Sequence, residues 1–198
     1  VLMGEGGRDR VTIDTQGGRI QARAAANGLV TVDMGSVKTD WREIPLAEDY
    51  DTMAVEVGVG RLETATCVNV GNPHAVFFVA DAEAIDLKTY GPQVEHHPLF
   101  PQRINVEAVH VNRDGSIRMR VWERGVGITR ACGTGACAAL AAAARRGRTG
   151  REAVVHLDGG PLHIAWPEDG PDAGHVLMTG PVAHSFSGVL SDRLLSQG

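Results

Sequence analysis

The chain has 198 residues and a formal net charge of −5 at pH 7, with 43% hydrophobic and 22% charged residues. These values are ordinary for a globular protein with a buried core, and the acidic balance argues against a nucleic-acid partner, which would require a basic stripe. No stretch approaches the roughly 20 apolar residues of a membrane-spanning helix, and an odd number of cysteines, three, does not suggest a disulfide framework. We therefore expect no membrane partner and a reducing, cytoplasmic environment.

Most of the chain is predicted to form short strands separated by turns. Alternating polar and apolar residues predict strands at residues 10–15, 19–23 and 29–34, and the Asn-Gly pair before residue 29 is a strong hairpin signal. Further strands are predicted at residues 104–111, 116–122, 153–157, 161–166 and 175–178.

Helices are predicted in two places only. Short helices at residues 86–90 and 92–97 are expected to flank Gly91. The clearest helix covers residues 135–146 and is closed by Gly147. It is almost wholly alanine, and a helix that is apolar on every side is buried on every side. We therefore expect an α+β fold in which a mixed or antiparallel sheet wraps around this central helix, rather than a βαβ series.

The start of this helix carries the densest chemical signal. Residues 129–138 read TRACGTGACA and place Cys132 before a glycine-rich turn. A helix N-terminus offers unpaired N–H groups and partial positive charge, and Gly133 and Gly135 would let a carboxylate or phosphate approach. We expect the pKa of the Cys132 thiol to fall there below about 8.5, as for a base or nucleophile; an inert buried cysteine is the alternative. Cys137, inside the apolar helix, is expected to be structural.

A charged pair precedes this region. Glu123 and Arg124 end a predicted strand, where they are placed to meet a zwitterion, with the guanidinium on a carboxylate. A solvated surface pair is the alternative.

Two polar positions lie between apolar segments. Residues 72–74, Asn-Pro-His, are predicted to form a tight turn, from which His74 can orient a ligand or tune a thiol. Asn105 interrupts an apolar strand, and a solvent-facing position would explain it equally well.

Taken together, these motifs resemble one family. The segments GNPH (71–74), RINVE (103–107) and WERGVGITRACGTGACAA (122–139) are similar, in this order, to diaminopimelate epimerases, and MTGPVAHSFSG (178–188) resembles the closing segment of that family. The family interconverts LL- and meso-diaminopimelate in lysine and peptidoglycan synthesis, without pyridoxal phosphate or metal. Two cysteines act on opposite faces of the α-carbon: one takes a proton as thiolate and the other donates one as thiol.

The resemblance implies a role for each matching residue. Cys132 matches the second acid/base cysteine, and Gly133 and Thr134 match the N–H donors for the reacting carboxylate. His74 and Glu123 match residues that adjust the protonation of the thiol. The residues implied at the far amino-acid end of the substrate are Asn72, Asn105, Glu123 and Arg124.

The resemblance also implies an organisation. The family fold has two lobes, each a sheet around a helix, with the active site between them. Residues 1–34 would be the last strands of the first lobe, residues 35–178 the second lobe, and residues 179–198 a closing segment that returns to the first. A homodimer is implied, with Phe186 at its interface.

One part of the family pattern is missing from the 198 residues. The first cysteine of the family lies in a CGNGxR-type motif, which does not occur here. Cys67 lies in a strand pattern without a glycine turn or helix after it. We therefore expect a chain that is truncated relative to the family and does not epimerise diaminopimelate alone.

Other functions remain open. Residues 133–138 match the dinucleotide fingerprint G-x-G-x-x-A, followed by Glu152, but no predicted strand runs directly into Gly133. Another cofactor-independent racemase or isomerase of this fold, such as a proline racemase or a phenazine-pathway isomerase, is a nearer alternative, as is a non-catalytic lobe that binds a ligand or assembles with a partner. The histidines at 96–97, 156 and 163 lack a ligand spacing with any cysteine, so no metal is expected.

Overall fold

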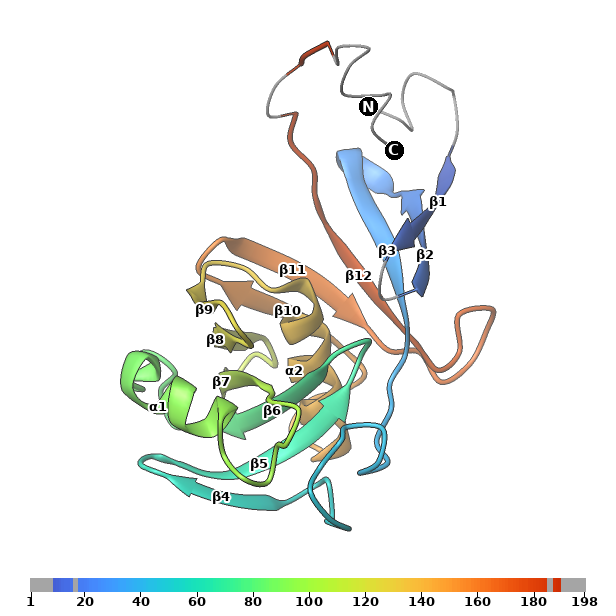
Figure 1. The fold of residues 1–198 in the computed structure, drawn as a ribbon. Helices are drawn as coiled ribbons and strands as arrows, with labels where there is room; N and C mark the ends of the chain where they lie inside the picture. The colour runs from blue at the N-terminus through green and yellow to red at the C-terminus, as the bar shows by residue number, and fades with distance from the viewer. Residues whose placement is uncertain (1–8, 16–17, 185–186, 190–198) are drawn as a thin grey trace.

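The computed structural model describes residues 9–15, 18–184 and 187–189. Within them the chain forms one sheet and two α-helices (Figure 1). The helices are α1 (Leu87–Glu95) and α2 (Gly133–Arg145), and a 3-10 turn, η1, covers Ala26–Gly28. The strands are β1 (Arg10–Thr15), β2 (Gly18–Ala24), β3 (Leu29–Ser36), β4 (Val55–Val59), β5 (Leu62–Asn69), β6 (Pro73–Phe78), β7 (Asn105–Val111), β8 (Ile117–Glu123), β9 (Gly127–Thr129), β10 (Glu152–Leu157), β11 (Gly160–Ala165) and β12 (His175–Pro181).

The sheet is mixed, as predicted. Its strand order is β1-β2-β3-β12-β11-β10-β8-β7-β6-β5-β4, with β9 beside β8. Two neighbouring pairs are parallel, β6 with β7 and β8 with β10, and the other pairs are antiparallel. Each parallel pair is joined through a helix, α1 or α2, so the sheet contains two crossovers that the sequence analysis did not anticipate.

The alanine-rich helix α2 lies inside the curled sheet (Figure 1). It contacts β5, β6, β7, β8, β10, β11 and β12, and every residue from Gly135 to Ala143 is buried. The helix begins at Gly133, two residues before the predicted start, with Cys132 as its N-cap. It ends at Arg145, one residue before the predicted end, and Gly147 follows as predicted: its φ of 63° lets the Arg148 N–H return to the Ala143 carbonyl at 2.9 Å.

The region around Gly91 is one helix, not the predicted two. Asp86 caps α1 through its side chain, and the helix continues through Gly91 and Pro92. A Cβ on Gly91 would lie 2.5 Å from the Trp122 ring. The glycine is therefore a packing requirement rather than a helix break, because only its bare Cα lets the indole of β8 approach.

The turn at residues 72–74 is also shorter than predicted. Gly71 takes a φ of 106°, and the Val70 N–H donates to the Asn72 carbonyl at 3.2 Å. Pro73 and His74 already belong to β6. His74 therefore has the fixed orientation of a strand residue.

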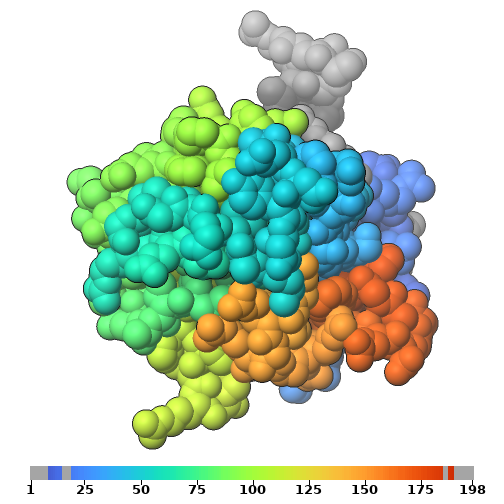
Figure 2. Space-filling view, turned by 90° about the horizontal axis from the view of Figure 1, so that it is seen from below, coloured from blue at the N-terminus to red at the C-terminus, as the bar shows by residue number. Residues whose placement is uncertain are grey.

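The first three strands and the last strand lie together at one end of the sheet. Strands β1, β2 and β3 join the rest of the sheet only through β12 and project from it (Figure 1), and Figure 2 shows the blue and orange-red segments on one flank. Only Ala22 and Thr31 are buried among the described residues of β1–β3. Phe186, the predicted dimer contact, lies outside the described residues.

Candidate active site

Several element ends meet at one edge of the sheet. Because β6 and β7 are parallel, His74 lies opposite Asn105 at their starts. Strand β8 is antiparallel to β7 and therefore ends where β7 begins. The first turn of α2 lies at the same edge, where a Cβ on Gly135 would be 3.2 Å from Glu107 Oε1. The topology thus gathers segments that are far apart in the sequence.

Cys132 caps α2 with its thiol. Its backbone is extended, with φ −137° and ψ 107°, and its Sγ accepts a hydrogen bond from the Gly135 N–H at 3.3 Å. Thr134 Oγ1 lies 3.5 Å from the same sulfur. Within the described part of the chain, the N–H groups of Gly133 and Thr134 have no acceptor. They are available to an anion at the positive end of the helix.

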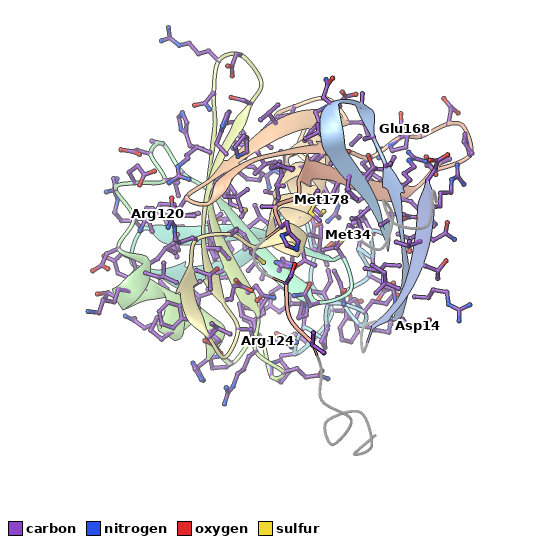
Figure 3. The ribbon with its side chains drawn as sticks, turned by 90° about the horizontal axis from the view of Figure 1, so that it is seen from above. Asp14, Met34, Arg120, Arg124, Glu168 and Met178 are labelled. Atoms are coloured by element: carbon purple, nitrogen blue, oxygen red, sulfur yellow. The ribbon has the colours of Figure 1, made fainter. Side chains whose placement is uncertain are left out.

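The surroundings of this helix start are apolar. Cys132 is 6% exposed and belongs to the core cluster around α2. Met34 and Met178, on the paired strands β3 and β12, pack against this cluster and lie over α2 in Figure 3. A Cβ on Gly133 would be 2.9 Å from Met178 Sδ. The glycine therefore lets the methionine close over the helix start.

The predicted lowering of the thiol pKa is wrong. Burial, followed by the negative charge of Glu107, raises the pKa of Cys132 to about 12, although hydrogen bonds with Thr134 and Gly135 act in the opposite direction. Desolvation of a thiolate outweighs these weak bonds. At neutral pH the thiol is therefore the resting form.

His74 and Glu107 form a buried pair behind the thiol. His74 Nδ1 lies 2.6 Å from Glu107 Oε1, and His74 Nε2 lies 2.8 Å from Asn72 Oδ1. Both members of the pair are 0% exposed. Glu107 Oε2 has no hydrogen-bond partner among the described residues. Burial raises the pKa of the Glu107 carboxyl, against the opposing effect of His74.

The sequence analysis missed Glu107 as a site residue. The signal was present, since Glu107 follows Asn105 at a spacing of two and therefore lies on the same face of the strand. Two polar side chains on one face of an otherwise apolar strand indicate a shared polar environment.

Asn105 is buried, so the solvent-facing alternative is wrong. Its Nδ2 donates to the Pro73 carbonyl at 2.8 Å, and its Oδ1 accepts from the Arg124 N–H at 2.9 Å. The side-chain amide therefore ties the start of β6 to the turn after β8. Its contact with a substrate stays a prediction.

Glu123 and Arg124 diverge at the end of β8. The Glu123 carboxylate accepts a hydrogen bond from the Thr129 hydroxyl of β9. Arg124 donates through its guanidinium to the Gln102 carbonyl at 3.1 Å. Glu123 raises the pKa of both Cys132 and Glu107 through its charge, so it lies within electrostatic reach of the thiol.

A second glutamate that the sequence analysis missed holds this turn in place. Glu95, in the last turn of α1, is 2% exposed. Its carboxylate accepts from Trp122 Nε1 at 2.7 Å and from the Gly125 N–H at 2.9 Å. Helix α1 thereby fixes the turn that carries Arg124.

A cavity of about 350 Å³ opens next to this turn. Asn72 and Arg124 line it together with Gln102 and Arg42, whose guanidinium lies 3.3 Å from Asp40. Glu43 also lines the cavity, and Arg42 is paired with Asp40. The Arg124 guanidinium and the Asn72 amide are therefore the groups that suit a carboxylate.

The remaining cysteines lie in the core. Cys67 on β5 and Cys137 in α2 are 0% exposed, and burial raises the pKa of both, to about 12 for Cys137. Among residues 9–15, 18–184 and 187–189, no three His, Cys, Asp or Glu side chains gather as a metal site. The helices in those ranges are too short or too polar to cross a membrane.

The dinucleotide alternative lacks its structural context. The glycine run at residues 133–138 follows β9, which is antiparallel to β8 and ends at Thr129. The fingerprint requires a strand that feeds directly into the first glycine.

Comparison with known proteins identifies relatives over most of the chain. Residues 66–185 match the family model for diaminopimelate epimerase. The chain is 60% identical over 189 residues to a diaminopimelate epimerase of Rhodospirillum centenum, covering 96% of this chain and 64% of the relative. It is 53% identical over 180 residues to a diaminopimelate epimerase of Erythrobacter litoralis, covering 91% of this chain and 65% of that relative. The chain thus spans slightly less than two thirds of these two relatives.

Solved structures show the same fold at low identity. A phenazine biosynthesis protein of Bacillus anthracis aligns with a TM-score of 0.59 and 12% identity, covering 91% of this chain and 69% of that one. The similarity supports the α+β assignment.

Proposed function

The chain belongs to the diaminopimelate epimerase family, and on this premise we propose that it carries one of the two proton-transferring thiols of an isomerase. The proposed reaction interconverts LL- and meso-diaminopimelate in lysine biosynthesis and uses no cofactor. The observation that carries the proposal is the Cys132 thiol at the start of α2, beside the N–H groups of Gly133 and Thr134, which have no acceptor among the described residues.

The polar groups around the thiol suit a substrate with an amino-acid group at each end. The N–H groups of Gly133 and Thr134 would hold the reacting carboxylate. Asn72 and Arg124, which line the cavity of about 350 Å³, would hold the far end. Asn105 would support both through its bonds to the Pro73 carbonyl and the Arg124 N–H. Glu123, at the end of β8, would contact the substrate ammonium.

The high pKa of Cys132 fits the role of proton donor. The resting thiol gives its proton to one face of the α-carbon, while a thiolate on the opposite face removes the α-hydrogen. Cys132 is then the thiolate, and the other sulfur holds the proton, so the reverse reaction exchanges the two roles. The start of α2 would stabilise the negative charge that develops on the substrate carboxylate. His74, acting through Glu107, would adjust the protonation of the Cys132 thiol. Glu123 would do the same through its charge.

A second thiol is needed for this exchange. Cys67 and Cys137 are fully buried in the core, and the CGNGxR-type motif does not occur in the 198 residues. We therefore propose that the chain alone does not exchange the α-hydrogen.

The test is deuterium uptake at the α-carbon of diaminopimelate in D₂O. The chain is assayed alone and mixed with a separately supplied first lobe that carries the CGNGxR-type motif. We expect exchange only in the mixture, its loss in Cys132→Ser and its retention in the matched variant Cys137→Ser. Exchange that survives Cys132→Ser would contradict the proposal, and exchange of proline in place of diaminopimelate would favour another racemase of this fold.

We also propose the domain boundaries and assembly implied by the family. Residues 1–34 and 179–198 would belong with the first lobe and residues 35–178 would form the second, in a cytoplasmic homodimer with Phe186 at the interface. The pairing of β3 with β12 and the small number of buried residues in β1–β3 support the boundaries. Size-exclusion chromatography of the mixture and of its Phe186→Ala variant tests the dimer, which that substitution should weaken.

A further inference from the structure

Asn72, His74 and Glu107 form a line of hydrogen bonds beside the thiol, from the half-buried Asn72 to the fully buried Glu107. Both ring nitrogens of His74 face oxygen atoms, Glu107 Oε1 at 2.6 Å and Asn72 Oδ1 at 2.8 Å. Asn72 Oδ1 is a carbonyl oxygen and can only accept a hydrogen bond. His74 Nε2 therefore carries a proton.

The second contact then requires one more proton. A neutral imidazole has a single N–H, and here it is used toward Asn72. The short contact between His74 Nδ1 and Glu107 Oε1 therefore contains a proton that belongs either to the ring or to the carboxyl. In both cases the His74–Glu107 pair holds two protons and has no net charge.

The pair lies directly behind the catalytic candidate. Gly135 separates them: a Cβ on it would be 3.2 Å from Glu107 Oε1 and 3.3 Å from Cys132 Sγ. A side chain here would fit only if its neighbours moved, so the carboxyl of Glu107 acts on the sulfur across a bare glycine. The fully buried Glu107 also leaves Oε2 without a partner among the described residues. A packing role alone does not explain this costly arrangement.

Other charged and titratable groups act on the same two residues. Glu123 on β8 acts on both Cys132 and Glu107, and His74 acts on Glu107. In turn, the charge of Cys132 raises the pKa of Cys137 in α2, and that of Glu107 raises the pKa of Cys67 on β5. Of the charges that act on Cys132, Glu107 has a larger effect than Glu123.

We propose that Glu107 is the positioning residue of this site: with His74 it holds a shared proton that fixes the ring and keeps the space behind Cys132 uncharged. When Glu107 gives up this proton at higher pH, its carboxylate is an anion next to the sulfur and opposes thiolate formation. For catalysis this inference rests on the proposed function. The charge state itself is a property of the chain and is measurable without substrate.

The test is the pH dependence of Cys132 alkylation by iodoacetamide, followed by peptide mass spectrometry on the intact 198-residue chain. In Glu107→Gln the side chain keeps its shape but cannot become an anion. We expect the Cys132 alkylation profile to move to lower pH by about one unit, which is about tenfold faster alkylation at pH 9. We also expect the ¹⁵N shifts of the His74 ring to change.

The matched control is Glu95→Gln, which alters the other buried glutamate that hydrogen-bonds within this region. It should leave the Cys132 profile and the His74 shifts in place, whatever it does to stability. Unchanged profiles and shifts in a folded Glu107→Gln, or an equal shift in Glu95→Gln, would overturn the proposal.

Two further measurements keep the proposal testable. If Glu107→Gln does not fold, NMR spectra of the unsubstituted chain provide the test. A singly protonated His74 ring together with the ¹³C carboxyl signal of an ionised Glu107 at neutral pH would contradict the shared proton. Deuterium exchange in the two-lobe mixture is measured separately. If exchange fails while the alkylation profile moves as expected, the proposed function is wrong and the role of Glu107 stands.

Discussion

At the residue scale, Cys132 is subject to two opposing influences. As the N-cap of α2 it accepts the Gly135 N–H, which favours the thiolate. As a residue 6% exposed, it is desolvated, and an ionised Glu107 beside it would oppose the thiolate further, so both effects favour the thiol. The second influence dominates. A substrate carboxylate at the start of α2 would add a further negative charge, so proton donation by the thiol is the easier first step.

The three buried thiols predict how stability depends on pH. Unfolded thiols ionise from about pH 8.5, whereas burial raises the pKa of Cys132 and Cys137 to about 12 and also raises that of Cys67. Above pH 8.5 the unfolded chain therefore binds fewer protons than the folded chain. The free energy of unfolding should fall as pH rises toward 12, by up to about 1.4 kcal/mol per pH unit for each thiol.

Urea unfolding at a series of pH values measures this slope. The variant Cys67→Ala/Cys137→Ala is the control, because it keeps every other titrating group and should show a shallower decline. Equal slopes in the two proteins would contradict the assignment of the effect to buried thiols.

Replacing the buried amide of Asn105 should lower the free energy of unfolding. In Asn105→Asp the shape is kept, but no N–H remains for the Pro73 carbonyl, and a charge is buried. We expect a loss of about 1–3 kcal/mol in the free energy of unfolding. Asn112→Asp, in the turn at the other end of β7, keeps an oxygen that can accept from the Ser116 hydroxyl and should change it by less than about 0.5 kcal/mol. Chemical denaturation compares the two, and equal effects would mean that the Asn105 bonds contribute little.

Individual site residues could be read from the sequence only where their signal was local. Cys132 could be located because its glycine turn and helix start are adjacent in the chain. Its pKa could not be predicted, because Glu107 reaches it from another strand and desolvation arises only when the sheet has closed. The importance of Glu95 depends in the same way on the packing of α1 against Trp122.

At the element scale, the residue at position 91 of α1 is determined by the Trp122 ring that packs against it. Gly91 lowers the intrinsic stability of a helix by about 1 kcal/mol relative to alanine, yet the Trp122 ring occupies the space that a Cβ would need. We therefore expect Gly91→Ala to destabilise the protein by about 1–3 kcal/mol despite the better propensity. A stabilised Gly91→Ala would show that the ring can move away.

Thermal unfolding and tryptophan fluorescence measure this effect, since the indole of Trp122 should shift. Gly150→Ala is the matched control: its Cβ would meet no atom within 4 Å and its φ is not positive, so it should be neutral or slightly stabilising.

Whether an element could be predicted from the sequence depends on whether its signal is local. Strands such as β1 and β10 were found because alternation of polar and apolar residues is a local property, and α2 because its alanines leave no polar face. Two helices were predicted in place of α1, because the local Gly-Pro pair is typical of a helix break. The parallel pairing of β8 with β10 was not predicted, since it depends on where α2 packs.

At the scale of the whole molecule, the described chain divides into a well-packed body and a thinly packed ribbon. Two core clusters, one around α2 and one between α1 and β4–β7, account for most buried hydrophobic residues. Strands β1–β3 contribute only Ala22 and Thr31 to the buried set among their described residues. Their cohesion therefore rests mainly on the hydrogen bonds of the ladder, which extends to β12.

This division predicts two levels of protection in native-state hydrogen exchange. Elements with few buried contacts open at a lower free energy than the global unfolding. Amides of β2 and β3 should therefore exchange through an opening that is less costly than that of α2 and β7, with the difference largest at low denaturant. Peptide-resolved mass spectrometry at increasing urea concentration measures both. A first lobe that covers β1–β3 in the mixture should raise their protection while leaving that of α2 unchanged. If β3 and α2 instead open in one step in the chain alone, the proposed boundary after residue 34 is not an energetic boundary.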